Sequence, residues 1–312
     1  MIGLPALYLM GGAVFAAFAL LSAFDATNAK RFGNAAFWGL LAISFLLGDL
    51  IGDIGNGVLA IGLVALAGFG RLGRGNPPTT SATQRVAFSA KLGNRLFLPA
   101  LIVPATALIG TLFLKDSGLI DPKQVTLVSL GIGVLIALLV CYVWLRPPLL
   151  APLEEGRRLM DSVGWAAVLP QMLAALGAVF ALAGVGEIVG GIAQNAIPSG
   201  NLFAAVTVYA IGMAVFTMMM GNAFAAFPIM TAAIGLPMLV GQFHGNPAII
   251  CAIGMLAGFC GTLMTPLAAN FNMVPAALLE LDDRNAVVKV QIGTALPLLL
   301  VNLLLIYFLA FR

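Results

Sequence analysis

Long apolar segments constrain this chain most, because about 20 apolar residues are needed for an α-helix to cross a bilayer. Five segments reach or approach that length: Leu4–Phe24, 97–114, Val125–Leu145, 163–189 and 292–311. Only 9% of the 312 residues are charged and 61% are hydrophobic, whereas soluble domains carry about 25% charged residues. The sequence therefore predicts an all-α, polytopic membrane protein.

Three further apolar regions, residues 35–69, 202–240 and 248–279, are interrupted near their middle. The interruptions are Asp49, Asp53 and Asn56 in the first region, Gly221, Asn222 and Pro228 in the second, and Gly261, Thr262, Pro266, Asn270 and Asn272 in the third. Lipid cannot satisfy the backbone groups that such breaks expose, so breaks persist only where they face protein or a water-filled cavity. We therefore expect functional groups at these three places.

The distribution of lysine and arginine predicts how the interrupted regions are oriented, because basic residues concentrate in cytoplasmic loops. Both loops that flank residues 35–69 are basic, which predicts a re-entrant helical hairpin that opens to the cytoplasm, with its tip near residues 48–57. Both loops that flank residues 202–240 lack lysine and arginine, which predicts a second re-entrant hairpin that opens outward. About six transmembrane helices and two hairpins result.

The same order of elements occurs twice in this prediction, with opposite orientation. Residues 1–145 form a first repeat of helix, hairpin, helix and helix, residues 146–162 form a cytoplasmic linker, and residues 163–312 form the second, inverted repeat. Inverted repeats with broken helices are typical of secondary transporters. A non-transporting scaffold subunit is the alternative, although such a subunit would need no polar hairpin tips.

Enzymatic activity is not expected, because the chain shows no nucleophile–base pair and contains a single histidine, His244. No metal site and no cofactor are predicted, apart from Na⁺ as a possible coupling ion. The charged stretch at residues 154–158 is expected to be a solvated surface run in the linker. Basic residues restricted to loops suit a membrane protein better than a nucleic-acid-binding one.

Neutral polar residues at the two breaks of the second half predict a substrate site. Helix N-termini favour anions, and asparagine amides can donate hydrogen bonds to a carboxylate. The predicted substrate-binding residues are Gly221, Asn222, Thr262, Thr265, Asn270 and, before the helix at 97–114, Asn94. For the break at residues 261–272 the alternative is a kinked packing helix, and for Asn94 it is an ordinary helix start.

The first predicted hairpin carries two acidic residues, Asp49 and Asp53, one helical turn apart. A charge at the bilayer centre costs about 2.5–3.5 kcal/mol on insertion scales, so both should face a cation, a proton or a cavity. Together with Asn56 they form the predicted site of cation or proton coupling. The alternative is that the tip lies at a shallow depth and that both carboxylates are hydrated.

Residues 221–228, 261–272 and 48–57 resemble one membrane subunit of the bacterial two-component 5-oxoproline (pyroglutamate) transporters. The resemblance extends over the whole chain. It implies a bacterial cytoplasmic (inner) membrane location, a second membrane subunit or a homo-oligomer, and a small carboxylate substrate, 5-oxoproline. It also implies membership of the broad ion-transporter superfamily, whose better-known members move carboxylates with Na⁺ or H⁺. Those members use Ser-Asn-Thr motifs where this chain has Gly221-Asn222 and Gly261-Thr262, which leaves the coupling cation open.

Overall fold

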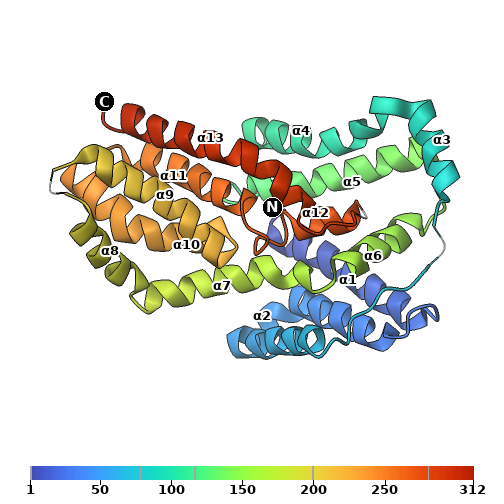
Figure 1. The fold of residues 1–312 in the computed structure, drawn as a ribbon. Helices are drawn as coiled ribbons and strands as arrows, with labels where there is room; N and C mark the ends of the chain where they lie inside the picture. The colour runs from blue at the N-terminus through green and yellow to red at the C-terminus, as the bar shows by residue number, and fades with distance from the viewer. Residues whose placement is uncertain (1, 78, 116, 199, 280) are drawn as a thin grey trace. The chain divides into compact units, whose positions relative to one another are not determined.

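The computed structural model describes residues 2–77, 79–115, 117–198, 200–279 and 281–312, which are mostly helical (Figure 1). Within these residues, eight helical segments are long and apolar enough to cross a membrane. The predicted all-α polytopic membrane protein is therefore confirmed. The chain divides into two compact units, Met1–Gly164 and Trp165–Arg312.

The first unit contains six α-helices and one short 3₁₀ segment. They are α1 (Leu4–Phe24), α2 (Arg31–Gly68), α3 (Ala82–Leu92), η1 (Gly93–Phe97), α4 (Leu98–Phe113), α5 (Val125–Leu145) and α6 (Ala151–Val163). Helices α1 and α5 have the predicted bounds, and α4 is one residue shorter at each end than the predicted 97–114. Helices α4 and α5 pack closely, since a Cβ on Gly133 would lie 3.0 Å from the carbonyl oxygen of Val103.

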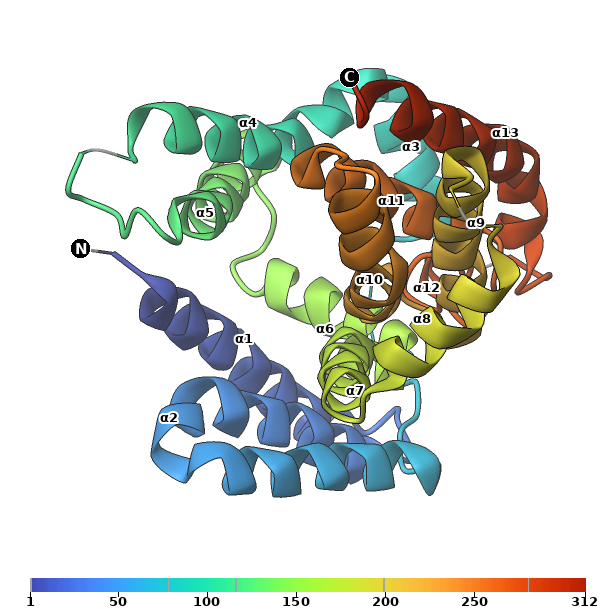
Figure 2. The ribbon, with the colours of Figure 1, turned by 90° about the vertical axis from the view of Figure 1, so that its left-hand side faces the viewer.

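Helix α2 is a helical hairpin, because its backbone leaves the helical region at Gly52, where φ is 65° and ψ is −174°. Glycine adopts positive φ without steric cost, and the chain reverses there to give two antiparallel arms (Figure 2). Asn34, near the start of α2, donates from Nδ2 to the Gly73 carbonyl at 2.8 Å and accepts from the Gly73 amide at 2.9 Å. The hairpin predicted at residues 35–69, with its tip near 48–57, is present. Its entry from the cytoplasm stays a prediction.

The second unit begins within a 3₁₀ segment, η2 (Gly164–Val168), which is followed in the described residues by seven α-helices and one π-helix. These are α7 (Leu169–Leu182), α8 (Val185–Ala196), α9 (Leu202–Met220), α10 (Ala223–Met230), the π-helix η3 (Thr231–Gln242), α11 (Pro247–Leu263), α12 (Met273–Leu278) and α13 (Ala286–Leu309). Helix α9 and the continuous α10–η3 segment form the second hairpin, which reverses at Gly221 and Asn222 as predicted. Helix α13 begins six residues before the predicted start at residue 292.

The single helix predicted at residues 163–189 is wrong, because the chain forms two helices there. Gly184 has a φ of 69°, a conformation that glycine adopts readily, so that α7 ends before it and α8 begins after it. Helix α8 packs against η3, since a Cβ on Gly190 would lie 2.9 Å from the carbonyl oxygen of Ala233. The loop predicted at residues 190–201 is therefore helical up to Ala196.

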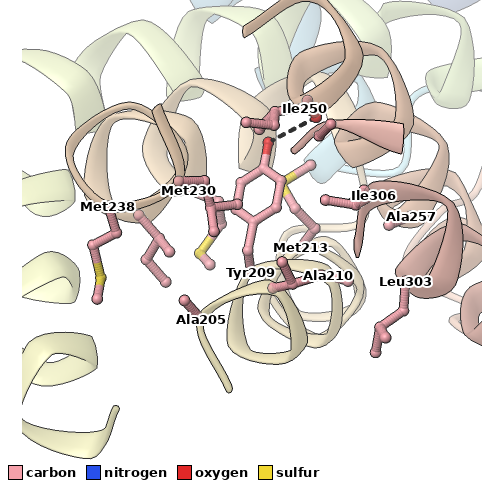
Figure 3. Packing of buried hydrophobic residues seen from close by; sticks show 14 of the residues in the cluster. Ala205, Tyr209, Ala210, Met213, Met230, Met238, Ile250, Ala257, Leu303 and Ile306 are labelled. Carbon is pink, nitrogen blue, oxygen red and sulfur yellow. Dashed lines mark hydrogen bonds between the residues drawn. The ribbon is translucent and has the colours of Figure 1, made fainter. Parts of the chain in front are cut away.

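The hydrophobic core of the second unit lies between α9, η3, α11 and α13 (Figure 3). Tyr209 is fully buried at its centre, and its hydroxyl lies 3.4 Å from Thr231 Oγ1 and 3.5 Å from the carbonyl oxygen of Ile250. Gly254 leaves the space that the Tyr209 ring fills. This packing holds the two arms of the second hairpin against α11 and so positions the hairpin tip.

Candidate functional site

The tip of the second hairpin is shaped by one glycine and one asparagine. Gly221 ends α9 in the left-handed conformation, with a φ of 75°. Asn222 caps α10, because its Oδ1 accepts a hydrogen bond of 2.7 Å from the Phe224 amide. Both residues are buried. A Cβ on Gly221 would lie 2.6 Å from the Leu267 carbonyl oxygen, so the tip packs directly on the chain that follows α11.

The break after α11 is closed by a residue that the predicted site omitted, Asn272. Its side chain is fully buried, and Nδ2 donates to the carbonyl oxygens of Thr262 at 2.8 Å and Thr265 at 2.7 Å. Carbonyl groups at a helix C-terminus have no partner within the helix, so Asn272 satisfies groups that the break leaves free. Asn272 belongs to the predicted break, but its sequence position alone did not distinguish it from Asn270.

A direct hydrogen bond joins the hairpin tip to the helix break. Thr265 donates from Oγ1 to the Met218 carbonyl oxygen at 3.1 Å, and Thr265 Oγ1 itself accepts from the Leu267 amide at 3.2 Å. Thr262 donates its hydroxyl to the Phe259 carbonyl in its own helix at 2.6 Å, and its backbone carbonyl, in the last turn of α11, accepts from Asn272. The two interrupted regions of the second half therefore meet, as predicted.

The predicted substrate residues are placed as follows. Gly221 and Thr265 make the contact between tip and break. Asn222 is the next residue of the tip, and Thr262 lies at the end of α11 and is held by Asn272. Asn270 lies on the same loop, partly buried, two residues before Asn272. Asn94 lies in η1 of the first unit and is exposed. Binding of substrate by any of these residues stays a prediction.

Two buried oxygen atoms near this contact have no hydrogen-bond partner within the described part of the chain, namely Thr217 Oγ1 and Asn272 Oδ1. Both side chains are fully buried. Thr217 lies one turn before the tip, where α11 approaches so closely that a Cβ on Gly258 would lie 3.3 Å from Thr217 Oγ1. An unsatisfied buried polar group costs about 1–3 kcal/mol. Neutral oxygens of this kind are suitable ligands for a hard cation.

Asn56 holds the turn of the first hairpin together, whereas the other polar side chains of this tip are exposed. Asn56 donates from Nδ2 to the carbonyl oxygens of Gly48 at 2.9 Å and Gly52 at 3.0 Å, and its Oδ1 accepts from Ser44 Oγ at 3.1 Å. Asp49 and Asp53 are exposed, and a Cβ on Gly52 would meet no atom within 4 Å. Asn56 therefore has a structural role at the tip. The coupling role of the two carboxylates stays a prediction.

A second buried polar site, in the first unit, was missed by the sequence analysis. We call it the acid–arginine cluster, and it consists of Asp25 after α1 and of Arg157 and Asp161 on α6. Arg157 Nη1 lies 2.8 Å from Asp25 Oδ2 and 3.5 Å from Asp161 Oδ2, and the three side chains are only 5–6% exposed. The prediction of a solvated run at residues 154–158 is wrong for Arg157. Its spacing of four residues from Asp161, on one helix face, was the available signal.

The Asp25 carboxyl is held in its ionised form by its neighbours. Burial alone would raise the pKa of Asp25, but hydrogen bonds from Thr27 and Arg157 lower this pKa below its ordinary value. Asp161 accepts a hydrogen bond of 2.8 Å from the indole Nε1 of Trp38 on α2. The cluster therefore fastens α6 to both α1 and α2.

Among the residues that the structure describes, no group of three or more His, Cys, Asp or Glu side chains is placed to hold a metal ion.

These features define a polytopic α-helical membrane protein in which a polar hairpin tip packs on a broken helix. The chain belongs to the family described as "Protein of unknown function (DUF979)", whose model matches residues 5–311. No curated protein and no solved structure matches the chain.

Proposed function

We propose that this protein is a secondary active transporter, or the transporting subunit of one, for a small carboxylate that moves together with Na⁺ or H⁺. The observation that carries the proposal is the contact between the second hairpin tip and the broken end of α11. Breaks in membrane helices expose backbone groups at the depth where a substrate must be held. Here two such breaks meet, and neutral polar side chains surround the point of contact.

The oxygen atoms at this contact favour a cation. Thr217 Oγ1 and Asn272 Oδ1 are buried acceptors without protein partners in the described residues, and neither is charged. Neutral oxygen ligands bind Na⁺ without the large electrostatic attraction that a carboxylate would add. A cation held in this way can be released again, as transport requires.

The N-terminus of α10 at the same tip favours an anion. Helix N-termini carry partial positive charge and present amide groups to a ligand. Asn222 fixes this end of α10 by capping it, and Asn270 lies on the facing loop with a partly buried side chain. A carboxylate and a cation bound side by side would partly neutralise each other, which lowers the cost of moving both through the protein.

The resemblance to the two-component 5-oxoproline transporters supports a more specific version of the proposal. In this version the substrate is 5-oxoproline, the protein lies in a bacterial cytoplasmic membrane, and a second membrane subunit completes the transporter. Asp49 and Asp53, exposed at the first hairpin tip, are the proposed sites for the coupling proton or cation. A scaffold role is the rival function, and it predicts that no residue of this chain affects the substrate affinity.

The test is uptake of radiolabelled 5-oxoproline into proteoliposomes that contain this chain, the second subunit, or both. We expect uptake only when this chain is present, with a dependence on a Na⁺ gradient or a pH gradient. Equal uptake by the second subunit alone would contradict the proposal and favour the scaffold role. Uptake of other small carboxylates in place of 5-oxoproline would correct the substrate but keep the reaction class.

A matched pair of helix-capping asparagines separates binding from folding. Asn222 caps α10 at the tip. Asn246 caps the N-terminus of α11, the end opposite to the break, by the same type of hydrogen bond. Alanine at either position should cost about 1 kcal/mol of stability. Only Asn222→Ala should also raise the apparent substrate constant, roughly 10–100-fold if one bond to a charged group of about 1.5–3 kcal/mol is lost. Equal effects of both variants on uptake would place the site elsewhere.

A further inference from the structure

The acid–arginine cluster is buried and contains more acidic groups than basic groups. Asp25 and Asp161 supply two carboxyl groups, and Arg157 supplies one guanidinium. If both carboxyl groups were ionised, the cluster would hold one net negative charge with side chains only 5–6% exposed. A buried charge without a partner is unfavourable, and a carboxyl group in that position takes up a proton instead.

The neighbouring groups do not supply the missing positive charge. Trp38, which donates to Asp161, and Asn34 on α2 are neutral, as is Thr27, which donates to Asp25. Three other cations lie on the neighbouring segments. Arg158 is paired with Glu155 at 2.7 Å. Arg74 and Lys30, which donate to the carbonyl oxygens of Ser162 at 2.9 Å and Gly70 at 2.6 Å, are exposed, so water and salt screen their charges from the buried cluster.

The geometry distinguishes the two carboxyl groups. Asp25 Oδ2 lies 2.8 Å from Arg157 Nη1, and Asp25 Oδ1 accepts two hydrogen bonds from Thr27. Asp161 is contacted by two neutral groups, the indole of Trp38 and the amide side chain of Asn34, and its contact with Arg157 is 3.5 Å long. Arg157 reaches both carboxyl groups through a single atom, Nη1, while its buried Nε has no partner in the described residues. It therefore forms no two-pronged pair, which would be the strongest arrangement, with either.

We propose that the acid–arginine cluster binds one proton at neutral pH, carried by Asp161, while α6 is packed on α1 and α2. With Asp161 neutral, the remaining Arg157–Asp25 pair is electrically balanced. When the pH rises and this proton leaves, the net negative charge returns and the packing of α6 weakens. The cluster thus makes the attachment of α6 dependent on pH. This inference concerns a site other than the hairpin tip and does not require that the chain transports a substrate.

The test is infrared difference spectroscopy of the purified full-length protein during a rise in pH, which detects the C=O stretch of a neutral carboxylic acid as it disappears. All proteins carry Asp49→Asn and Asp53→Asn, so that the acidic tip of the first hairpin does not contribute. We expect one protonated carboxyl group per chain in this background. Adding Asp161→Asn should abolish its band, whereas adding Asp283→Asn, which alters an exposed pair with Lys289, should leave it unchanged.

A second variant tests the charge balance itself. Asp25→Asn removes the other carboxyl group, so that Arg157 balances Asp161 and the proton is no longer needed. We therefore expect this variant to lose the band as well, although Asp161 is intact. Persistence of the band in folded Asp161→Asn, or its absence from the background protein, would overturn the proposal.

A third variant keeps the proposal testable if neither aspartate variant folds. Trp38→Phe preserves an aromatic ring but removes the hydrogen bond that stabilises ionised Asp161. The proton should then be released at a higher pH than in the background protein. An unchanged or lower pH of release would contradict Asp161 as the carrier.

Discussion

At each of the three interruptions of the apolar regions, one asparagine side chain forms hydrogen bonds with the backbone. Asn56, Asn222 and Asn272 each bind backbone groups that a turn or a helix end leaves free. The sequence predicts that polar residues are needed at such breaks, because lipid cannot replace them. It does not predict that Asn272 rather than Asn270 is the buried one, since that depends on the path of the loop after α11.

Asn272 should therefore be more important for stability than Asn270. Asn272→Ala leaves the carbonyl oxygens of Thr262 and Thr265 without their donor, which should cost about 1–3 kcal/mol. Asn270→Ala removes a partly buried amide on the same loop and should cost less. Thermal unfolding in detergent compares the two variants, and equal loss of stability would contradict the buried role of Asn272.

The acid–arginine cluster was beyond sequence analysis for a different reason. Asp25 and Arg157 are 132 residues apart, and no local pattern connects them. Burial of Arg157 follows from the packing of α6 on α1, where Gly156 allows the Phe18 ring to approach. Only the pairing of Arg157 with Asp161 on the same helix face was accessible from the sequence.

The pKa of Asp25 predicts how this residue affects stability with pH. The pKa of an unfolded Asp lies near 3.8, and the folded pKa of Asp25 is lower. The stabilisation by Asp25 is thus complete above the unfolded value and is lost as the pH falls through the folded value. The destabilisation caused by Asp25→Asn should be largest near neutral pH and should shrink in acid. Asp283→Asn is the control and should have little effect at any pH, because exposed ion pairs contribute little.

At the scale of elements, uninterrupted helices were predicted better than broken ones. Helices α1 and α5 have the predicted bounds because their apolar runs end in polar residues. The break at Gly184 was missed because a single glycine within an apolar run does not show whether the helix continues. The π-helix η3 was not predicted either, because its sequence is as apolar as that of an α-helix.

A sequence motif shared by the two halves became recognisable only from the structure. Gly93 and Gly164 both have positive φ, 51° and 58°, and each begins a 3₁₀ segment of five residues. In both cases Leu-Pro follows and opens an apolar helix, α4 or α7. This junction relates α4 to α7, whereas the predicted repeat relates α4 to the broken region that contains α11. The inverted repeat stays a prediction.

The turn of the second hairpin should be sensitive to a single methyl group. Gly221→Ala places a side chain on a residue with a φ of 75° and only 2.6 Å from the Leu267 carbonyl oxygen. The cost should be about 1–3 kcal/mol from backbone strain alone, with a matching loss of uptake. Gly57→Ala is the control, because nothing lies within 4 Å of that position. A Gly221→Ala variant as stable and active as Gly57→Ala would contradict the tight contact between tip and break.

At the scale of the whole molecule, the apolar helices establish a multi-pass membrane protein, and the positions of basic residues predict its orientation. The two ends of α2 lie together, since Asn28 and Asn34 both bind the Gly73 carbonyl oxygen. This contact agrees with a hairpin that enters and leaves on one side.

Cysteine labelling in intact cells or oriented vesicles tests this topology. The three native cysteines, Cys141, Cys251 and Cys260, are first replaced by alanine, and single cysteines are then placed near Lys30 and near Arg74. Both positions should react with a membrane-impermeant reagent from the cytoplasmic side only. Reaction of the two positions from opposite sides would show that α2 crosses the membrane completely.

The π-helix η3 has a consequence for motion of the second hairpin. In a π-helix each backbone hydrogen bond joins residues five apart, instead of four apart as in an α-helix. Such segments are rare overall, but those that occur are frequently found at functional sites. Conversion of one π turn to an α turn lengthens this arm of the hairpin and rotates the residues beyond the turn, without breaking the chain. The arm of the hairpin that includes η3 can thus change its length and move the tip. We expect the amides of Thr231–Gln242 to exchange with deuterium faster than those of α9, and to slow when substrate binds at the tip.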